Sequence, residues 1–177
     1  MIIIPGQLIA LLTFPGVIVH ELSHLLFCKM FNVNVKEVCF FRFDKTPGYV
    51  VHEGSTHPCK VLCISMGPFL VNTILGGIIG LSAAVPAYEF GDYSFNDVVV
   101  LWAGISIAMH AFPSQTDAHA LRQFVRSNPV SRLIKYLFIP VSYILQTGAA
   151  LSVIWLDFAY GIFVVYGASK LFLRAVL

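Results

Sequence analysis

Long apolar segments separated by short polar stretches limit the folds that this chain can adopt. The apolar segments cover approximately residues 2–31, 61–85, 98–112, 130–155 and 158–177. A helix needs about 20 consecutive apolar residues to cross the hydrocarbon core of a bilayer, so the third segment is short for a full crossing. Only 11% of the residues are charged, whereas soluble chains carry about 25%. The sequence therefore predicts an all-α multi-pass membrane protein with about five transmembrane helices.

The polar segment 32–60 lies between the first two apolar segments. Apolar residues alternate with polar or small ones between Val33 and Phe40, and residues 49–52 have the composition of a second strand. Between them, the sequence DKTPG at 44–48 is typical of a turn. We therefore expect a β-hairpin or small sheet at the membrane surface, between the first and second spans.

We expect a single membrane-embedded domain over residues 1–177. The candidate site residues all lie in a core of about residues 1–128, and the two last spans follow over about 130–177. The net charge of +2 and the scattered basic residues argue against nucleic acid as a partner, and the lipid bilayer is the expected surrounding. The cysteines form no CxxC pair and are predicted to be free thiols; they are Cys28, Cys39, Cys59 and Cys63.

Basic residues set the expected orientation through the positive-inside rule. They occur in the segment 32–60 and again in 122–135, whereas the loop 86–97 carries acidic residues and no basic one. The two basic segments are expected in the cytoplasm and the acidic loop outside. Lys170 and Arg174 place the C-terminus in the cytoplasm, so that a chain with about five spans has an external N-terminus.

The first apolar segment contains the HExxH pentad His20-Glu21-Leu22-Ser23-His24. On a helix, His20 and His24 lie one turn apart on one face, where both imidazoles can bind a single zinc ion. Glu21 then lies beside the metal as a candidate general base. Ionisable residues inside a membrane-spanning segment are costly and are therefore candidates for function. The predicted orientation places the pentad toward the cytoplasmic end of its span.

A catalytic zinc site has three protein ligands and one open position, so the pentad requires a third ligand. The candidates are His52, Glu53, His57, His110, Asp117 and His119. Asp117 follows the third apolar segment, whose end is also cytoplasmic, and it is the only acidic residue near a span end there. Its alternative role is to cap a helix that Ser114 begins. The alternative for His110 is a hydrogen-bonded histidine in the helix packing, and His52, His57 and His119 fit ordinary surface positions.

In three pieces, the chain resembles the site-2 protease family of intramembrane zinc metalloproteases. The first piece is the HExxH at 20–24, and the second, GPFLVN at 67–72, is similar to the family's GPxxN element with one extra residue before Asn72. The third piece, FPSQTD at 112–117, occupies the place of the family's LDG motif, although Thr116 and Ala118 flank Asp117 where the family has Leu and Gly. The resemblance covers roughly the first 120 residues and indicates a distant or minimal member.

The resemblance implies one zinc ion per chain, with His20, His24 and Asp117 as ligands and Glu21 as the catalytic base. It also implies a role near the active site for Asn72, for which an interhelical hydrogen bond is the alternative. His110 is the nearest counterpart of a further family asparagine, so His110 and Asn72 are both candidates to assist catalysis.

The expected function is hydrolysis of peptide bonds in transmembrane protein or peptide substrates. Zinc lowers the pKa of a water molecule from about 16 toward about 7, and Glu21 takes its proton and passes it to the leaving amine. The polar β segment offers an edge to which an unwound substrate can add as a strand. The alternative is a non-proteolytic membrane zinc-binding or metal-transport protein. Transporters often contain internal repeats, and this sequence contains no repeat that we can find.

Overall fold

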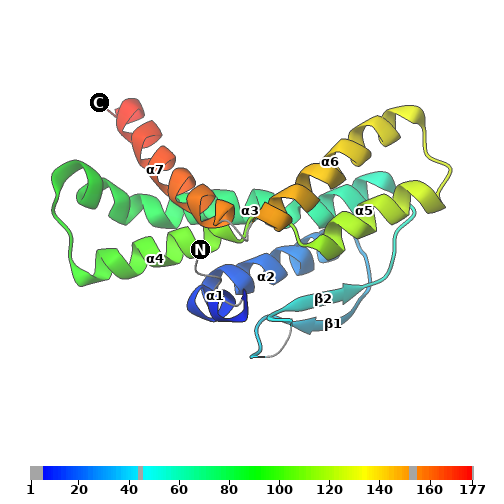
Figure 1. The fold of residues 1–177 in the computed structure, drawn as a ribbon, viewed down its shortest axis with the longest axis horizontal. Coiled ribbons are helices and arrows are strands. Elements are labelled where there is room, and N and C mark those ends of the chain that lie inside the picture. The colour runs from blue at the N-terminus through cyan, green and yellow to red at the C-terminus, as the bar shows by residue number, and fades with distance from the viewer. Residues whose placement is uncertain (1–5, 44–45, 152–154, 177) are drawn as a thin grey trace.

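Helices dominate the computed structural model, which describes residues 6–43, 46–151 and 155–176 (Figure 1). The chain forms α-helices α1 to α7, one short π-helix and a two-stranded sheet in this described part. The hairpin lies along α2 at one edge of the molecule, and α6 and α7 rise away from the other helices in different directions. The elements that carry the HExxH pentad and Asp117 therefore lie in the middle of the fold.

The first apolar segment forms two helices instead of one kinked span. Helices α1 (Gly6–Leu12) and α2 (Phe14–Met30) meet at Thr13 with a bend of 90°. Pro15 lies in the first turn of α2, where its missing N–H costs no helical hydrogen bond. Pro15 therefore lies at the start of a new helix instead of bending a continuous one. Residue 2, where we expected the segment to begin, lies outside the described residues.

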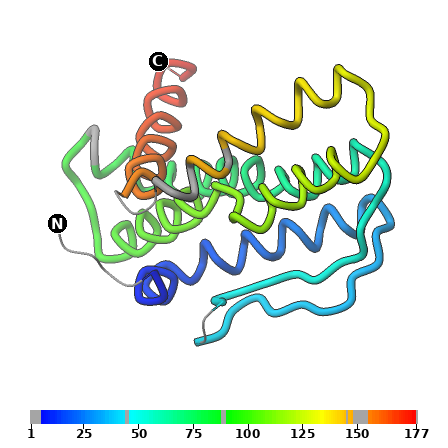
Figure 2. Tube along the Cα trace, turned by 45° about the vertical axis from the view of Figure 1, so that its right-hand side comes forward, coloured from blue at the N-terminus to red at the C-terminus, as the bar shows by residue number. Residues whose placement is uncertain are grey.

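The predicted β-hairpin is confirmed. Strands β1 (Val35–Cys39) and β2 (Tyr49–His52) pair antiparallel, with Val38 opposite Val50. Both strands contact α2, and Figure 2 shows the hairpin running beside that helix. Asp44 and Lys45 of the predicted turn lie outside the described residues.

Small residues bring the next two helices into close contact. Helix α3 (Pro58–Val85) is followed by the π-helix η1 (Pro86–Phe90), by Gly91 with φ of 64° and by α4 (Phe95–Met109). A Cβ atom at Gly104 of α4 would lie 2.6 Å from the Cα atom of Gly80, and one at Gly76 would lie 2.6 Å from the amide of Ala108. Gly76 and Gly80 form a GxxxG pair at this contact, and a larger residue at Gly76 or Gly104 would push α3 and α4 apart.

Helices α5 (Gln115–Ser127) and α6 (Arg132–Leu151) pack on each other and on the first turns of α3. Leu121, Phe124 and Phe138 are buried at the centre of this contact. Ser114 caps α5 in a capping box with Asp117, which confirms the predicted helix start at Ser114. The last helix, α7 (Leu156–Val176), crosses α3 and α4 and contacts both.

The apolar helices indicate a membrane protein, but they support fewer spans than the expected five. Among the described residues, α3 and α7 are long and apolar enough to cross a membrane, and the bent pair of α1 and α2 is a third candidate. Helix α4 has 15 residues, which is about 22 Å at 1.5 Å per residue and less than the roughly 30 Å of a bilayer core. Helix α6, which carries Arg132 and Lys135 in its first turn, is not among the candidates found in the described part of the chain.

Candidate metal centre

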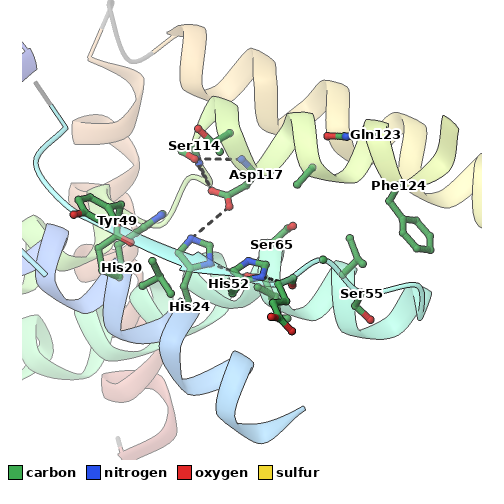
Figure 3. Close-up of a pocket in the computed structure, with 18 of the residues that line it drawn as sticks. His20, His24, Tyr49, His52, Ser55, Ser65, Ser114, Asp117, Gln123 and Phe124 are labelled. Carbon is green, nitrogen blue, oxygen red and sulfur yellow. Dashed lines mark hydrogen bonds and ion pairs between the residues drawn. The ribbon is translucent and has the colours of Figure 1, made fainter. Parts of the chain in front are cut away.

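Three side chains from two distant parts of the sequence meet between α2 and α5. His20 and His24 lie one turn apart on α2, with ring centroids 5.0 Å apart, and Asp117 approaches from the first turn of α5. Each residue offers one potential ligand atom, and these three atoms all lie within 4.8 Å of one another. Figure 3 shows the imidazoles and the carboxylate pointing toward one another. The structure thus brings together the three residues that the sequence predicts as metal ligands.

The two carboxylate oxygens of Asp117 have different partners. Oδ2 accepts hydrogen bonds from the backbone amide of Ser114 at 2.8 Å and from its hydroxyl at 2.7 Å. Oδ1 lies 3.5 Å from Nε2 of His24. From the sequence, Asp117 is a candidate both for a helix cap and for a metal ligand, and the geometry is compatible with both roles at once. The cap fixes the side-chain rotamer and thereby aims Oδ1 at the histidines.

The surroundings of Asp117 favour its ionised form. Burial acts to raise the pKa of the carboxyl, but the hydrogen bond and charge of His24, the charge of His20 and the hydrogen bond from Ser114 lower it to about 2. The carboxylate is therefore negative at neutral pH and needs a positive partner, because its side chain is only 15% exposed. A protonated histidine or a cation satisfies this need.

Backbone carbonyl groups determine which nitrogen of each imidazole faces Asp117. Nδ1 of His20 donates to the carbonyl of His110 at 2.7 Å, and Nδ1 of His24 donates to the carbonyl of Ile64 at 3.0 Å. A carbonyl oxygen only accepts, so each Nδ1 carries a hydrogen and each Nε2 remains available as a ligand. Carbonyl groups commonly orient metal-binding histidines in this way. Sequence reasoning missed both carbonyls, because a backbone group leaves no residue-type signal.

Glu21 lies beside the histidines at the meeting point of two cavities. The larger cavity, of about 470 Å³, extends from His20, Glu21 and His24 between the strand β2 and the helix α5. The smaller one, of about 310 Å³, is lined by His20 and Glu21 and by residues of α1, α4 and the start of α7. Gly48 lines both cavities and packs so closely on Glu21 that a Cβ atom there would lie 2.7 Å from Cγ of Glu21. Glu21 is thus accessible from both cavities, and Gly48 of the hairpin segment restricts the position of its side chain.

Asn72 holds three helices together. Its side-chain amide donates to the carbonyls of Gly16, Ile107 and His110 at 3.1–3.3 Å, and its oxygen accepts from Ser23 at 3.4 Å. The side chain is completely buried and lines neither cavity beside Glu21. These contacts fit the interhelical hydrogen bond that the sequence analysis left open as the alternative to a role near the substrate.

His110 contributes its backbone and its side chain to different features. The carbonyl accepts from His20 and Asn72, whereas the ring donates through Nδ1 to the carbonyl of Ser106 at 2.9 Å. The ring also lines the smaller cavity together with Asp157, the first acidic residue of α7. His110 therefore orients His20 directly, and its ring is not part of the group formed by His20, His24 and Asp117.

The other candidate ligands are not part of the group formed by His20, His24 and Asp117. His52 and Glu53 line the larger cavity, His57 precedes α3 as its N-cap residue, and His119 lines another cavity, between α5 and α6. Tyr49, which the sequence analysis did not single out, lines the larger cavity and donates a hydrogen bond to Glu37, and this bond raises the pKa of the Tyr49 phenol. Strand composition alone gives no signal for such a position.

Two imidazole nitrogens and one carboxylate oxygen form a donor set of the kind that binds zinc. In each histidine the hydrogen on Nδ1 is bonded to a carbonyl, which leaves Nε2 available. The carboxylate oxygen Oδ1 takes no part in the helix cap. All three atoms are therefore available to bind a metal ion. Comparison with protein-family models, with curated proteins and with solved structures found no match to this chain.

Proposed function

We propose that the chain is an intramembrane zinc metalloprotease similar to the site-2 protease family. The observation that carries the proposal is the convergence of His20 and His24 of α2 with Asp117 of α5. Supporting it, both Nε2 atoms are oriented by carbonyl groups, and a glutamate follows the first histidine as in zinc peptidases. One zinc ion per chain is the proposed cofactor.

Each residue of the centre has a defined task in this proposal. Zinc bound there acts as a Lewis acid that makes water nucleophilic near neutral pH. Glu21 accepts a proton from the attacking water and returns it to the leaving amine, which requires its side chain to reach both sides of the cleaved bond. Its position between two cavities agrees with that requirement. His110 and Asn72 act on the scaffold, the first by orienting His20 and the second by joining α2, α3 and α4.

The larger cavity suits an extended peptide. Residues of β2 and the segment after it, up to Ser55, line one side of it, and residues of α5 from Ala120 to Ser127, with the C-cap residue Asn128, line the other. In the described part of the chain, β2 pairs only with β1, so that its second edge has free backbone groups. A substrate helix unwound in this cavity can add to that edge as a third strand and place a carbonyl carbon beside Glu21. The substrate class is therefore a membrane-spanning protein or peptide.

The proposed orientation places this centre on the cytoplasmic side, with the N-terminus outside and the C-terminus inside. Cys59, which is exposed in the first turn of α3, provides a test. In a variant that keeps Cys59 as its single cysteine, a membrane-impermeant maleimide should label inside-out vesicles and leave intact cells unlabelled. Labelling from outside in intact cells would reverse the orientation.

Zinc content and cleavage together test the function. Purified protein in lipid nanodiscs should contain about one zinc per chain and should cut a single-span reporter whose transmembrane helix contains Asn-Pro. The variant Glu21→Gln should keep the zinc and lose the cleavage, whereas Asp92→Asn, an exposed loop residue, should retain both. Full cleavage by Glu21→Gln would overturn the mechanism. Zinc binding without cleavage by the wild-type chain would instead favour a non-proteolytic metal-binding protein.

A further inference from the structure

A separate polar cavity of about 450 Å³ lies between α5 and α6. Five of its lining residues come from α5 and one from α6; they are His119, Arg122, Gln123, Arg126, Ser127 and Tyr143. None of them is acidic, although Arg122 and Arg126 both carry a positive charge. Neither arginine takes part in any of the ion pairs found among the described residues. The lining of the cavity thus concentrates positive charge, with no acidic residue among the described residues that form it.

Arg122 has hydrogen-bonding capacity that the protein leaves unused. Its Nη1 donates to Oε1 of Gln146 at 2.5 Å, and its guanidinium lies 6.0 Å from the ring centroid of Tyr143. Its Nη2 is buried and has no hydrogen-bond partner among the described residues. A buried donor without an acceptor is costly, and this cost is larger for a charged group. A negatively charged acceptor in the cavity removes this cost.

The surroundings of the cavity indicate where such an acceptor comes from. Tyr136 and Ile139 precede Tyr143 by seven and four residues on α6, so these three side chains share one face of the helix. Tyr136 is 76% exposed, Ile139 40% and Tyr143 57%. An apolar, uncovered helix face therefore leads directly into the basic cavity. This combination matches an amphiphile with an anionic head and a hydrocarbon tail.

We propose that this cavity binds the phosphate of an anionic phospholipid. The phosphate oxygens accept from Nη2 of Arg122 and from the guanidinium of Arg126, and the acyl chains lie along the face of α6 that contains Tyr136 and Ile139. Arginine is suited to this task, because its planar fork donates two parallel hydrogen bonds to a phosphate. Gln123 and Ser127 line both this cavity and the larger cavity beside Glu21, so the proposed lipid site adjoins the larger cavity along α5.

The proposal is tested with protein purified in a neutral detergent. Phosphatidylglycerol and phosphatidylcholine with identical acyl chains are titrated separately, and inorganic phosphate is added in a third series. Bound lipid is counted by native mass spectrometry, and the temperature of unfolding is followed in parallel. We expect phosphatidylglycerol to bind at least tenfold more tightly than phosphatidylcholine and to raise the unfolding temperature, with phosphate alone giving no such rise.

Variants locate the site. Arg122→Gln and Arg126→Gln should each weaken phosphatidylglycerol binding by about tenfold or more, because each removes one charged donor. Arg174→Gln, an exposed arginine near the end of α7, serves as the matched control and should bind like the wild type. Arg126 is exposed, so its variant decides the question if Arg122→Gln does not fold.

Three results would overturn the proposal. The first is equal affinity for the two lipids, and the second is unchanged phosphatidylglycerol binding in Arg126→Gln. The third is a stabilisation by inorganic phosphate as large as that by phosphatidylglycerol, which would assign the cavity to a free anion. Metal content and cleavage do not enter any of these measurements, so the outcome is independent of the proposed protease activity.

Discussion

Oδ1 of Asp117 lies 3.5 Å from Nε2 of His24, and a helix cap determines this approach. The other oxygen of Asp117 is held by Ser114, so that the carboxylate cannot rotate away from α2 without breaking two hydrogen bonds. An HExxH pentad on one helix thereby gains an acidic neighbour from a helix far along the chain. The candidate metal centre depends both on the pentad of α2 and on the capped Asp117 of α5.

The two roles of Asp117 can be separated by substitution. Asp117→Asn keeps an oxygen that caps α5 and removes the negative charge, so we expect α5 to remain folded and zinc to be lost. Ser114→Ala removes the hydroxyl of the capping box and keeps the carboxylate; it should lower the free energy of unfolding by about 1 kcal/mol and retain most of the zinc. Metal analysis and unfolding in detergent measure both effects. Zinc retained in Asp117→Asn would show that Asp117 is not a ligand.

The lowered pKa of Asp117 predicts an acid-dependent loss of stability in the metal-free protein. The folded pKa of about 2 lies below the ordinary value of 3.8, so the ionised carboxylate stabilises the folded state above pH 4. This contribution, about 2 kcal/mol, is lost as the pH falls from about 4 to about 2. The difference in unfolding free energy between wild type and Asp117→Asn, measured after chelation, should shrink over that interval. Parallel pH profiles of the two proteins would contradict the prediction.

Asn72→Ala should weaken the packing of α2, α3 and α4 without removing the metal ligands. The substitution leaves the carbonyls of Gly16 and Ile107 without their side-chain donor, and a buried unpaired polar group costs about 1–3 kcal/mol. We expect a lower free energy of unfolding, with zinc content and cleavage per folded molecule close to the wild type. Thr73→Ala, which removes a contact with Tyr160 on α7, is the neighbouring control. A large loss of cleavage in fully folded Asn72→Ala would assign the amide to the substrate instead.

Gly48 and Gly54 form a matched pair for testing how the hairpin positions Glu21. Both line the larger cavity, but a Cβ atom at Gly48 would meet Glu21 and the carbonyl of Phe40, whereas one at Gly54 would meet nothing within 4 Å. Gly48→Ala should therefore displace Glu21 or the start of β2 and reduce cleavage, while zinc binding persists. Gly54→Ala should have little effect on either. Equal activity of the two variants would mean that Gly48 does not constrain the base.

The elements that were predictable from the sequence depend on local signals. The pentad, the hairpin and the Ser114 cap were all recognised, because each is specified by neighbouring residues and by short-range backbone preferences. The number of spans was overestimated, because composition does not show where a helix breaks. Helices α1 and α2 are bent by 90° relative to each other at Thr13, and α4 ends after 15 residues.

The sequence by itself determined that His20 and His24 share a helix face with Glu21 next to them, and it named Asp117 as the acid that could join the two histidines. Only the tertiary structure decided that Asp117 reaches His24 while capping its own helix, and that Asn72 joins helices instead of lining a cavity. It also supplied the carbonyls of Ile64 and His110 that orient the imidazoles. The physical reason is that helical spacing is fixed by local geometry, whereas contacts between distant segments depend on how all the helices pack together.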